Sequence, residues 1–123
     1  MNNNFLIIKN MKLFINSLDN IISVIPNRDR ILKDRLYNTS YDILYYLNLA
    51  NYGDKKEYGS IILSNISMLD FYLERCLKNR YINSKMCERK CNELLRITKM
   101  VYGWLRDGSK CVWFIRYIWK RSW

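Results

Sequence analysis

The chain has 123 residues, of which 50% are hydrophobic and 15% aromatic, and its formal net charge is +10. That length is typical of a single domain, and that much apolar surface excludes a disordered chain. With 1 Pro and 4 Gly, the sequence has too few turn residues for a β-sandwich or barrel. The composition therefore predicts one helical domain.

The positive charge is concentrated in the last third of the sequence. Residues 1–77 hold 9 Lys or Arg and 8 Asp or Glu, whereas residues 78–123 hold 12 Lys or Arg and 3 Asp or Glu. A local basic excess is typical of proteins that bind a polyanion, either nucleic acid or an anionic membrane. The alternative is a charge that serves solubility alone.

In the first half of the chain, apolar residues recur at steps of three and four, which predicts two helices. The first covers residues 4–25 and ends at Pro26, and the second follows a cap at Asn27 and ends at the interruption 51–54. The positions on their inner faces are Met11, Phe14, Ile15, Leu18, Ile21, Ile22, Ile25, Leu32, Leu36, Thr39, Ile43, Leu47 and Ala50.

The same periodicity predicts two further helices. The third begins at Lys56 and ends before the break at 79–83, and the fourth follows a cap at Ser84 and stops near 107–108. Their inner faces carry Tyr58, Ile62, Ile66, Leu69, Leu73, Cys76, Cys87, Cys91, Leu94, Thr98, Val101 and Leu105.

Short links between long helices force neighbours to run in opposite directions. We therefore expect an all-α, antiparallel up-down-up-down four-helix bundle over residues 1–108, followed by a basic, aromatic C-terminal tail over residues 109–123. Six apolar or aromatic residues lie beyond the inner faces and predict a subunit interface. They are Tyr37, Tyr41, Tyr45, Leu49, Tyr72 and Trp104.

Five cations share one face of the fourth predicted helix. At 100° per residue they fall within an arc of about 100° opposite the apolar stripe. They are Lys85, Arg89, Arg96, Lys99 and Arg106. We expect this face to lack compensating carboxylates, so that a partner must relieve the repulsion, and we interpret it as a phosphate-binding surface rather than an idle solvated face.

The sequence offers little for catalysis, a metal or a cofactor. There is no His, no phosphate-binding or dinucleotide-binding glycine motif and no C-x2-C pair, and Asp70 and Glu74 lack further carboxylates with which to hold Mg²⁺. We expect no enzyme activity, no metal and no cofactor. Four cysteines without a secretory signal predict free thiols in a cytoplasmic protein, and no apolar run is long enough for a membrane span.

Short motifs follow one another in a specific order between residues 10 and 106. The best markers are Asp34-Arg35-Leu36, an expected loop at Ala50-Asn51-Tyr52, and Met100 followed by Gly103-Trp104. In this order the chain resembles the accessory variability determinant (Avd) family, which accompanies the reverse transcriptases of diversity-generating retroelements. The four-helix proteins encoded in intervening sequences of 23S ribosomal RNA genes are the nearest rival, and Ala50-Asn51-Tyr52 favours the retroelement family.

The resemblance implies a small basic four-helix protein that assembles as a homo-oligomer, a ring-shaped pentamer. It implies that the protein binds the retroelement's reverse transcriptase and template RNA and supports synthesis of mutagenised cDNA. A purely structural oligomer that packs its basic end on an acidic protein or an RNA partner is the competing hypothesis.

The predicted tail lies outside the resemblance and has no carboxylate beyond residue 108. Its cations and aromatic rings suit single-stranded RNA, where rings stack on bases. The same mixture suits a membrane interface or a contact with a neighbouring subunit, so all three roles stay open. The candidate RNA-binding residues of the tail are Lys110, Trp113, Arg116, Tyr117, Trp119, Lys120 and Arg121.

Overall fold

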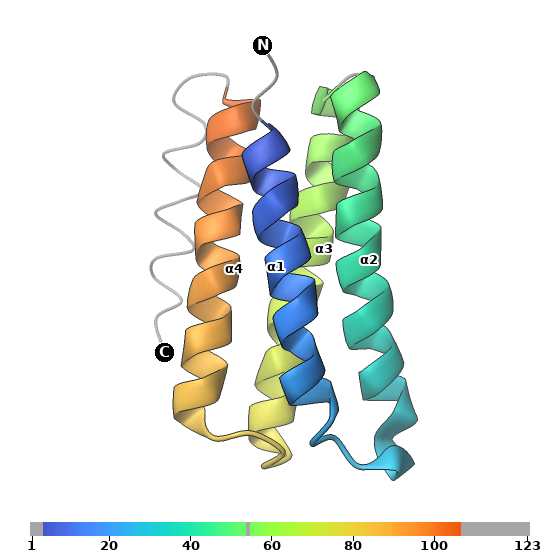
Figure 1. The fold of residues 1–123 in the computed structure, drawn as a ribbon, viewed down its shortest axis with the longest axis vertical. Helices are drawn as coiled ribbons and strands as arrows, with labels where there is room; N and C mark the ends of the chain where they lie inside the picture. The colour runs from blue at the N-terminus through green and yellow to red at the C-terminus, as the bar shows by residue number, and fades with distance from the viewer. Residues whose placement is uncertain (1–3, 54, 107–123) are drawn as a thin grey trace.

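The structure is a computed structural model that describes residues 4–53 and 55–106, and it contains only helices within these ranges (Figure 1). The elements are α1 (Asn4–Ile22), the short 3-10 helix η1 (Asn27–Asp29), α2 (Arg30–Tyr52), α3 (Lys55–Lys78) and α4 (Ser84–Leu105). The predicted all-α class is confirmed for the described part of the chain.

The four long helices lie side by side (Figure 1). Both α1 and α3 pack against α2 and α4, and the most extensive contact joins α2 to α3. The loops that precede α2 and α4 lie at the lower end of the bundle in Figure 1, and the start of α1 and the end of α4 lie at its upper end. We call the lower end the loop end.

The core consists of the predicted inner faces. All of their positions are buried except Tyr58 and Leu105, which are half-buried. The Leu105 side chain packs directly against Gly59 of α3, since a Cβ atom on Gly59 would lie 2.7 Å from Leu105 Cδ1. The periodicity therefore identified which face of each helix is buried, and the structure adds the close approach at Gly59.

The predicted cap of α2 is wrong by two residues. Asn27 starts η1 rather than capping the helix, and its side-chain oxygen accepts a hydrogen bond from Lys33 Nζ at 2.8 Å. The N-cap of α2 is Asp29, whose carboxylate accepts from the backbone N–H of Leu32 at 3.4 Å. An aspartate is as good a cap as an asparagine, so the local sequence left the choice open.

Two other predicted boundaries also shift. α1 ends at Ile22 instead of residue 25, because the chain tightens into turns before Pro26. At α4, Ser84 is the first helical residue rather than the cap, and Asn83 Oδ1 accepts from the backbone N–H of Met86 at 2.8 Å.

Two predictions near the upper end are corrected. Ala50-Asn51-Tyr52 is not a loop but the last turn of α2, which ends with a hydrogen bond from the Gly53 N–H to the Leu49 carbonyl. Trp104 is not exposed surface: it is buried, and Lys55 Nζ donates to its backbone carbonyl at 2.7 Å and lies 5.8 Å from the ring centroid.

Candidate nucleic-acid interface

The outer face of α4 is the surface that the sequence predicts to bind phosphates. Lys85, Arg89 and Arg96 are exposed on it and Lys99 is half-buried, whereas Arg106 is exposed but lies beyond the end of α4. Arg106 has a non-helical backbone, with φ −48° and ψ 132°, so the prediction that it continues the helical arc of the other four cations is wrong. We call these five residues the α4 stripe.

The α4 stripe has little local neutralisation. Within the described residues, Lys85, Arg89, Arg96 and Arg106 form no ion pair and no side-chain hydrogen bond. The expected absence of carboxylates is nevertheless wrong, because exposed Glu88 lies at the edge of the same arc, about −60° from Lys85. The face remains predominantly cationic.

Lys90, which the sequence pattern does not single out, is the one buried lysine among the described residues. Its ammonium group donates to Ser17 Oγ on α1 and to Glu93 Oε1 at 3.1 Å, and it lies 5.5 Å from the centroid of the Phe14 ring. Its position between Cys87 and Cys91 on the inner side of the helix was a signal that could have identified it. Lys90 therefore ties α4 to α1 and does not belong to the cationic surface.

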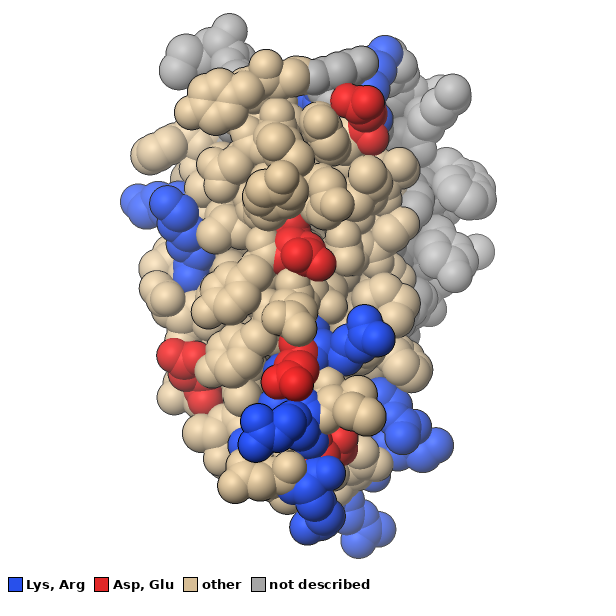
Figure 2. All heavy atoms as spheres, turned by 90° about the vertical axis from the view of Figure 1, so that its right-hand side faces the viewer, with Lys and Arg blue, Asp and Glu red and all other residues tan. Residues whose placement is uncertain are grey.

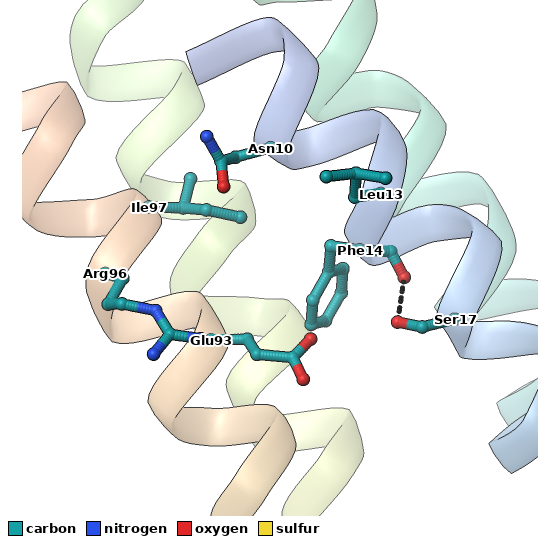
Figure 3. Close-up of a pocket in the computed structure, with 7 residues that line it drawn as sticks. All are labelled: Asn10, Leu13, Phe14, Ser17, Glu93, Arg96 and Ile97. Carbon is teal, nitrogen blue, oxygen red and sulfur yellow. Dashed lines mark hydrogen bonds between the residues drawn. The ribbon is translucent and has the colours of Figure 1, made fainter. Parts of the chain in front are cut away.

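A cavity of about 310 Å³ lies between α1 and α4, beside this ion pair (Figure 3). In Figure 3 the Phe14 ring reaches from α1 toward α4, and Arg96 and Glu93 reach into the same region from α4. Arg96 thus belongs both to the α4 stripe and to the rim of this cavity. The lining residues are Asn10, Leu13, Phe14, Ser17, Glu93, Arg96 and Ile97.

Three of the four cysteines fall within the described residues, and all three are buried free thiols, as predicted. The sulfur atoms of Cys87 and Cys91 are 4.0 Å apart, and Cys87 Sγ donates to the Leu73 carbonyl. Burial raises the pKa of Cys76 to about 12, and the hydrogen bond with Cys87 together with burial raises the pKa of Cys91. These thiols are packing groups. No set of three potential metal ligands comes together in the part of the chain that the structure describes.

A row of tyrosines follows the outer side of α2. Tyr41 and Tyr45 are 52% and 58% exposed, and the rings of Tyr37 and Tyr41 stack with centroids 6.0 Å apart. Tyr37 donates to Asp19 Oδ1 at 2.8 Å, which raises its phenol pKa. Figure 2, which faces α2, shows uncharged side chains over much of the upper and middle part of this side. We call Tyr37, Tyr41 and Tyr45 the tyrosine row.

Two further predicted interface residues are less exposed than Tyr41 and Tyr45. Leu49 and Tyr72 are half-buried, as is Tyr37.

The candidate residues of the tail, from Lys110 to Arg121, lie outside the described residues, and so does Cys111.

Comparison with known proteins gives no independent assignment. No protein-family model matches the chain, and neither a curated protein nor a solved structure matches it. The resemblance to the Avd family therefore stays a prediction. Within residues 4–53 and 55–106, none of the helices is long and apolar enough to span a membrane.

Proposed function

We propose that this protein is a non-catalytic accessory subunit of a diversity-generating retroelement, which binds template RNA and the reverse transcriptase to support mutagenic cDNA synthesis. The observation that carries the proposal is the α4 stripe, in which four exposed cations lack ion-pair partners among the described residues. The family resemblance supplies the identity of the RNA and of the polymerase.

The α4 stripe fits a nucleic-acid backbone for an electrostatic reason. From Lys85 to Arg106 the cations extend over about 30 Å, at 1.5 Å per helical residue. Like charges along one helix face repel one another, and phosphate groups relieve that repulsion while releasing their own counterions. Binding of this kind tolerates many sequences and weakens steeply as salt is added.

The wider proposal concerns the arrangement of the helices, the assembly of subunits and the cellular location. It includes an antiparallel up-down-up-down order of the helices, a basic C-terminal extension and a cytoplasmic location. The tyrosine row supports a homo-oligomer, since exposed aromatic patches mark interfaces, and the resemblance implies five subunits. The absence of His from the sequence supports a role without catalysis of its own.

A second candidate function is a structural oligomer of the type encoded in 23S ribosomal RNA intervening sequences, with an acidic protein or RNA as partner. The tyrosine row favours this candidate as much as the first, because it supports assembly without reference to the reverse transcriptase. Genomic neighbourhood separates the two: an adjacent reverse transcriptase gene with near-identical template and variable repeats supports the retroelement.

The RNA part of the proposal is tested by titrating the full chain with a single-stranded RNA of about 30 nucleotides at several salt concentrations. If about six phosphates are neutralised, log K falls with log salt at a slope near −4 to −5. Changing all five residues of the α4 stripe to Gln flattens this slope.

The matched control keeps the charge: Arg89→Lys, Arg96→Lys and Arg106→Lys together should retain the slope, because non-specific phosphate binding depends on charge. Helical circular dichroism verifies that both variants fold. Unaltered RNA affinity in the Gln variant contradicts the α4 stripe as the site.

A further inference from the structure

Exposed cations from two segments distant in sequence lie at the loop end. Arg28 and Arg30 lie where α2 begins, and Lys78 and Arg80 lie where α3 ends. Figure 2 shows Lys and Arg side chains crowded at the lower end of the side on which α2 lies, with some Asp and Glu side chains beside them. We call these four residues the loop-end patch.

A specific hydrogen bond holds the two loops together. The Tyr81 hydroxyl donates to Asp29 Oδ2 at 2.9 Å, between residues that are 52 positions apart. This bond raises the pKa of the Tyr81 phenol, while the positive charge of Arg28 acts in the opposite direction, which places Arg28 within electrostatic reach of that ring. Arg28 and Arg80 each immediately precede one of the two bonded residues, so the bond brings the segments that carry these arginines together.

Arg80 is held in an unfavourable backbone conformation. Its φ is 64°, in the left-handed region. The N–H of Arg80 bonds to the Leu77 carbonyl and the N–H of Tyr81 bonds to the Cys76 carbonyl, both at 2.9 Å, which is the pattern that closes a helix with a left-handed residue. Glycine is the usual residue there, because a side chain is strained in this conformation. The chain places an exposed arginine at a position that glycine would fill more stably.

The start of α2 also carries cations at an unfavourable position. Its first turn contains no acidic residue, although the helix dipole favours negative charge there. The N-cap Asp29 is the acidic residue at this terminus, and its two carboxylate oxygens accept from uncharged donors, the Leu32 N–H and the Tyr81 hydroxyl, rather than from a cation. Within the described residues, none of the four cations of the loop-end patch forms an ion pair or a side-chain hydrogen bond.

We propose that the loop-end patch is a second binding site for the phosphate backbone of single-stranded RNA, separate from the α4 stripe. The inference rests on the proposed function, because it takes RNA as the ligand. Lys85 lies in the first turn of α4 at the same end, so one strand can pass from the loop-end patch onto the α4 stripe.

Geometry favours RNA over an anionic membrane as the partner. Exposed Val24 and Ile31 near this end suit a membrane surface. The loop-end patch, however, lies at the end of the bundle and the α4 stripe along its side, and a flat bilayer cannot cover both together. A flexible polyanion bends around the edge and neutralises both.

The first test uses Arg80→Gly in the full chain with the same RNA of about 30 nucleotides. Because glycine relieves the left-handed strain, the melting temperature should rise by a few degrees. Affinity should nevertheless fall about fivefold at about 0.1 M salt, because one lost phosphate contact carries a salt slope of about 0.7. A variant that is more stable and binds more weakly cannot owe its weaker binding to unfolding.

The second test combines Arg28→Gln, Arg30→Gln, Lys78→Gln and Arg80→Gly, which should reduce the magnitude of the salt slope by about 3. The control is Lys9→Gln with Lys12→Gln on the exposed side of α1, which should leave the slope nearly unchanged.

The outcomes separate the two proposals. If the α4 stripe variant loses RNA while the loop-end variant binds like the parent, the second site is wrong and the proposed function stands. If the parent itself does not bind RNA, both proposals fail. If the four cations govern binding to phosphatidylserine vesicles and not to RNA, the patch is a membrane contact and the inference is overturned.

Discussion

Lys90 Nζ lies 3.1 Å from Glu93 Oε1, in an ion pair whose lysine side chain is 8% exposed and whose glutamate side chain is 26% exposed. Removal of the carboxylate leaves a buried ammonium group, whereas removal of the ammonium leaves a carboxylate that water can reach. We expect Glu93→Ala to lower the free energy of unfolding by about 1–2 kcal/mol and Lys90→Met to lower it less. Urea titration measures both, and the reverse order contradicts this account of the pair.

Gly103 and Gly59 form a matched pair of helical glycines with different surroundings. A Cβ at Gly103 meets no described atom within 4 Å, so Gly103→Ala should raise the free energy of unfolding by about 0.5–1 kcal/mol. At Gly59 the added Cβ would lie 2.7 Å from Leu105 Cδ1. This steric clash offsets the gain in stability that alanine would otherwise give. Leu105→Ala should make Gly59→Ala more favourable in a double-mutant cycle, and additive effects would refute the close approach.

The Tyr81 hydroxyl couples stability to high pH. Its pKa is raised in the folded protein by the hydrogen bond to Asp29, so the stabilisation is complete below the ordinary value of 10.0 and is lost as pH rises through the folded value. We expect the urea midpoint of the parent to fall above about pH 10 more steeply than that of Tyr81→Phe. Parallel pH profiles for the two proteins would count against the coupling.

The buried thiols should react only after unfolding. Because burial raises the pKa of Cys76 to about 12, its thiolate is scarce at about pH 8 and inaccessible to reagent. Peptide mapping after thiol labelling should show Cys76 and Cys91 protected in the folded protein and fully labelled in urea. Rapid labelling of Cys76 without denaturant would show that this part of the core opens.

The tyrosine row should carry an assembly contact. Tyr41→Ser with Tyr45→Ser should reduce the particle mass measured by light scattering at micromolar concentration, because it removes two exposed aromatic side chains. Leu13→Ser, which alters a similarly exposed apolar residue on α1, is the control and should leave the mass unchanged. A parent that is strictly monomeric at this concentration contradicts the oligomer itself.

The buried faces of the helices could be predicted because the helical period is a local property of the sequence. Leu36 and Val101 sit on apolar stripes that need no knowledge of neighbouring helices. Lys90 could not be assigned in the same way, since its ammonium group is stabilised by Ser17, which lies 73 residues away on another helix. Trp104 likewise lies at the edge of the apolar stripe of α4. Its backbone carbonyl accepts a hydrogen bond from Lys55 of α3, a contact between two helices that the sequence pattern does not show.

The α4 stripe could be predicted because its members share one helix, whereas the loop-end patch could not. Arg28 lies in a part of the sequence, residues 1–77, whose charges almost cancel. The segments that carry Arg28 and Arg80 meet only when the fold joins them through the bond between Tyr81 and Asp29. The left-handed backbone at Arg80 is also invisible in the sequence, since glycine is the residue that normally marks it.

The contact pattern of the four helices has a consequence for folding kinetics. The largest contact, between α2 and α3, joins neighbours in sequence, whereas the smallest, between α1 and α4, closes a loop that includes most of the chain. Because loop closure costs more entropy as the loop lengthens, the contact between α2 and α3 is expected to form early and the contact between α1 and α4 to form last. The same contact holds Lys90 and the cavity of Figure 3, so amide hydrogens along α1 should exchange with solvent before those of α3.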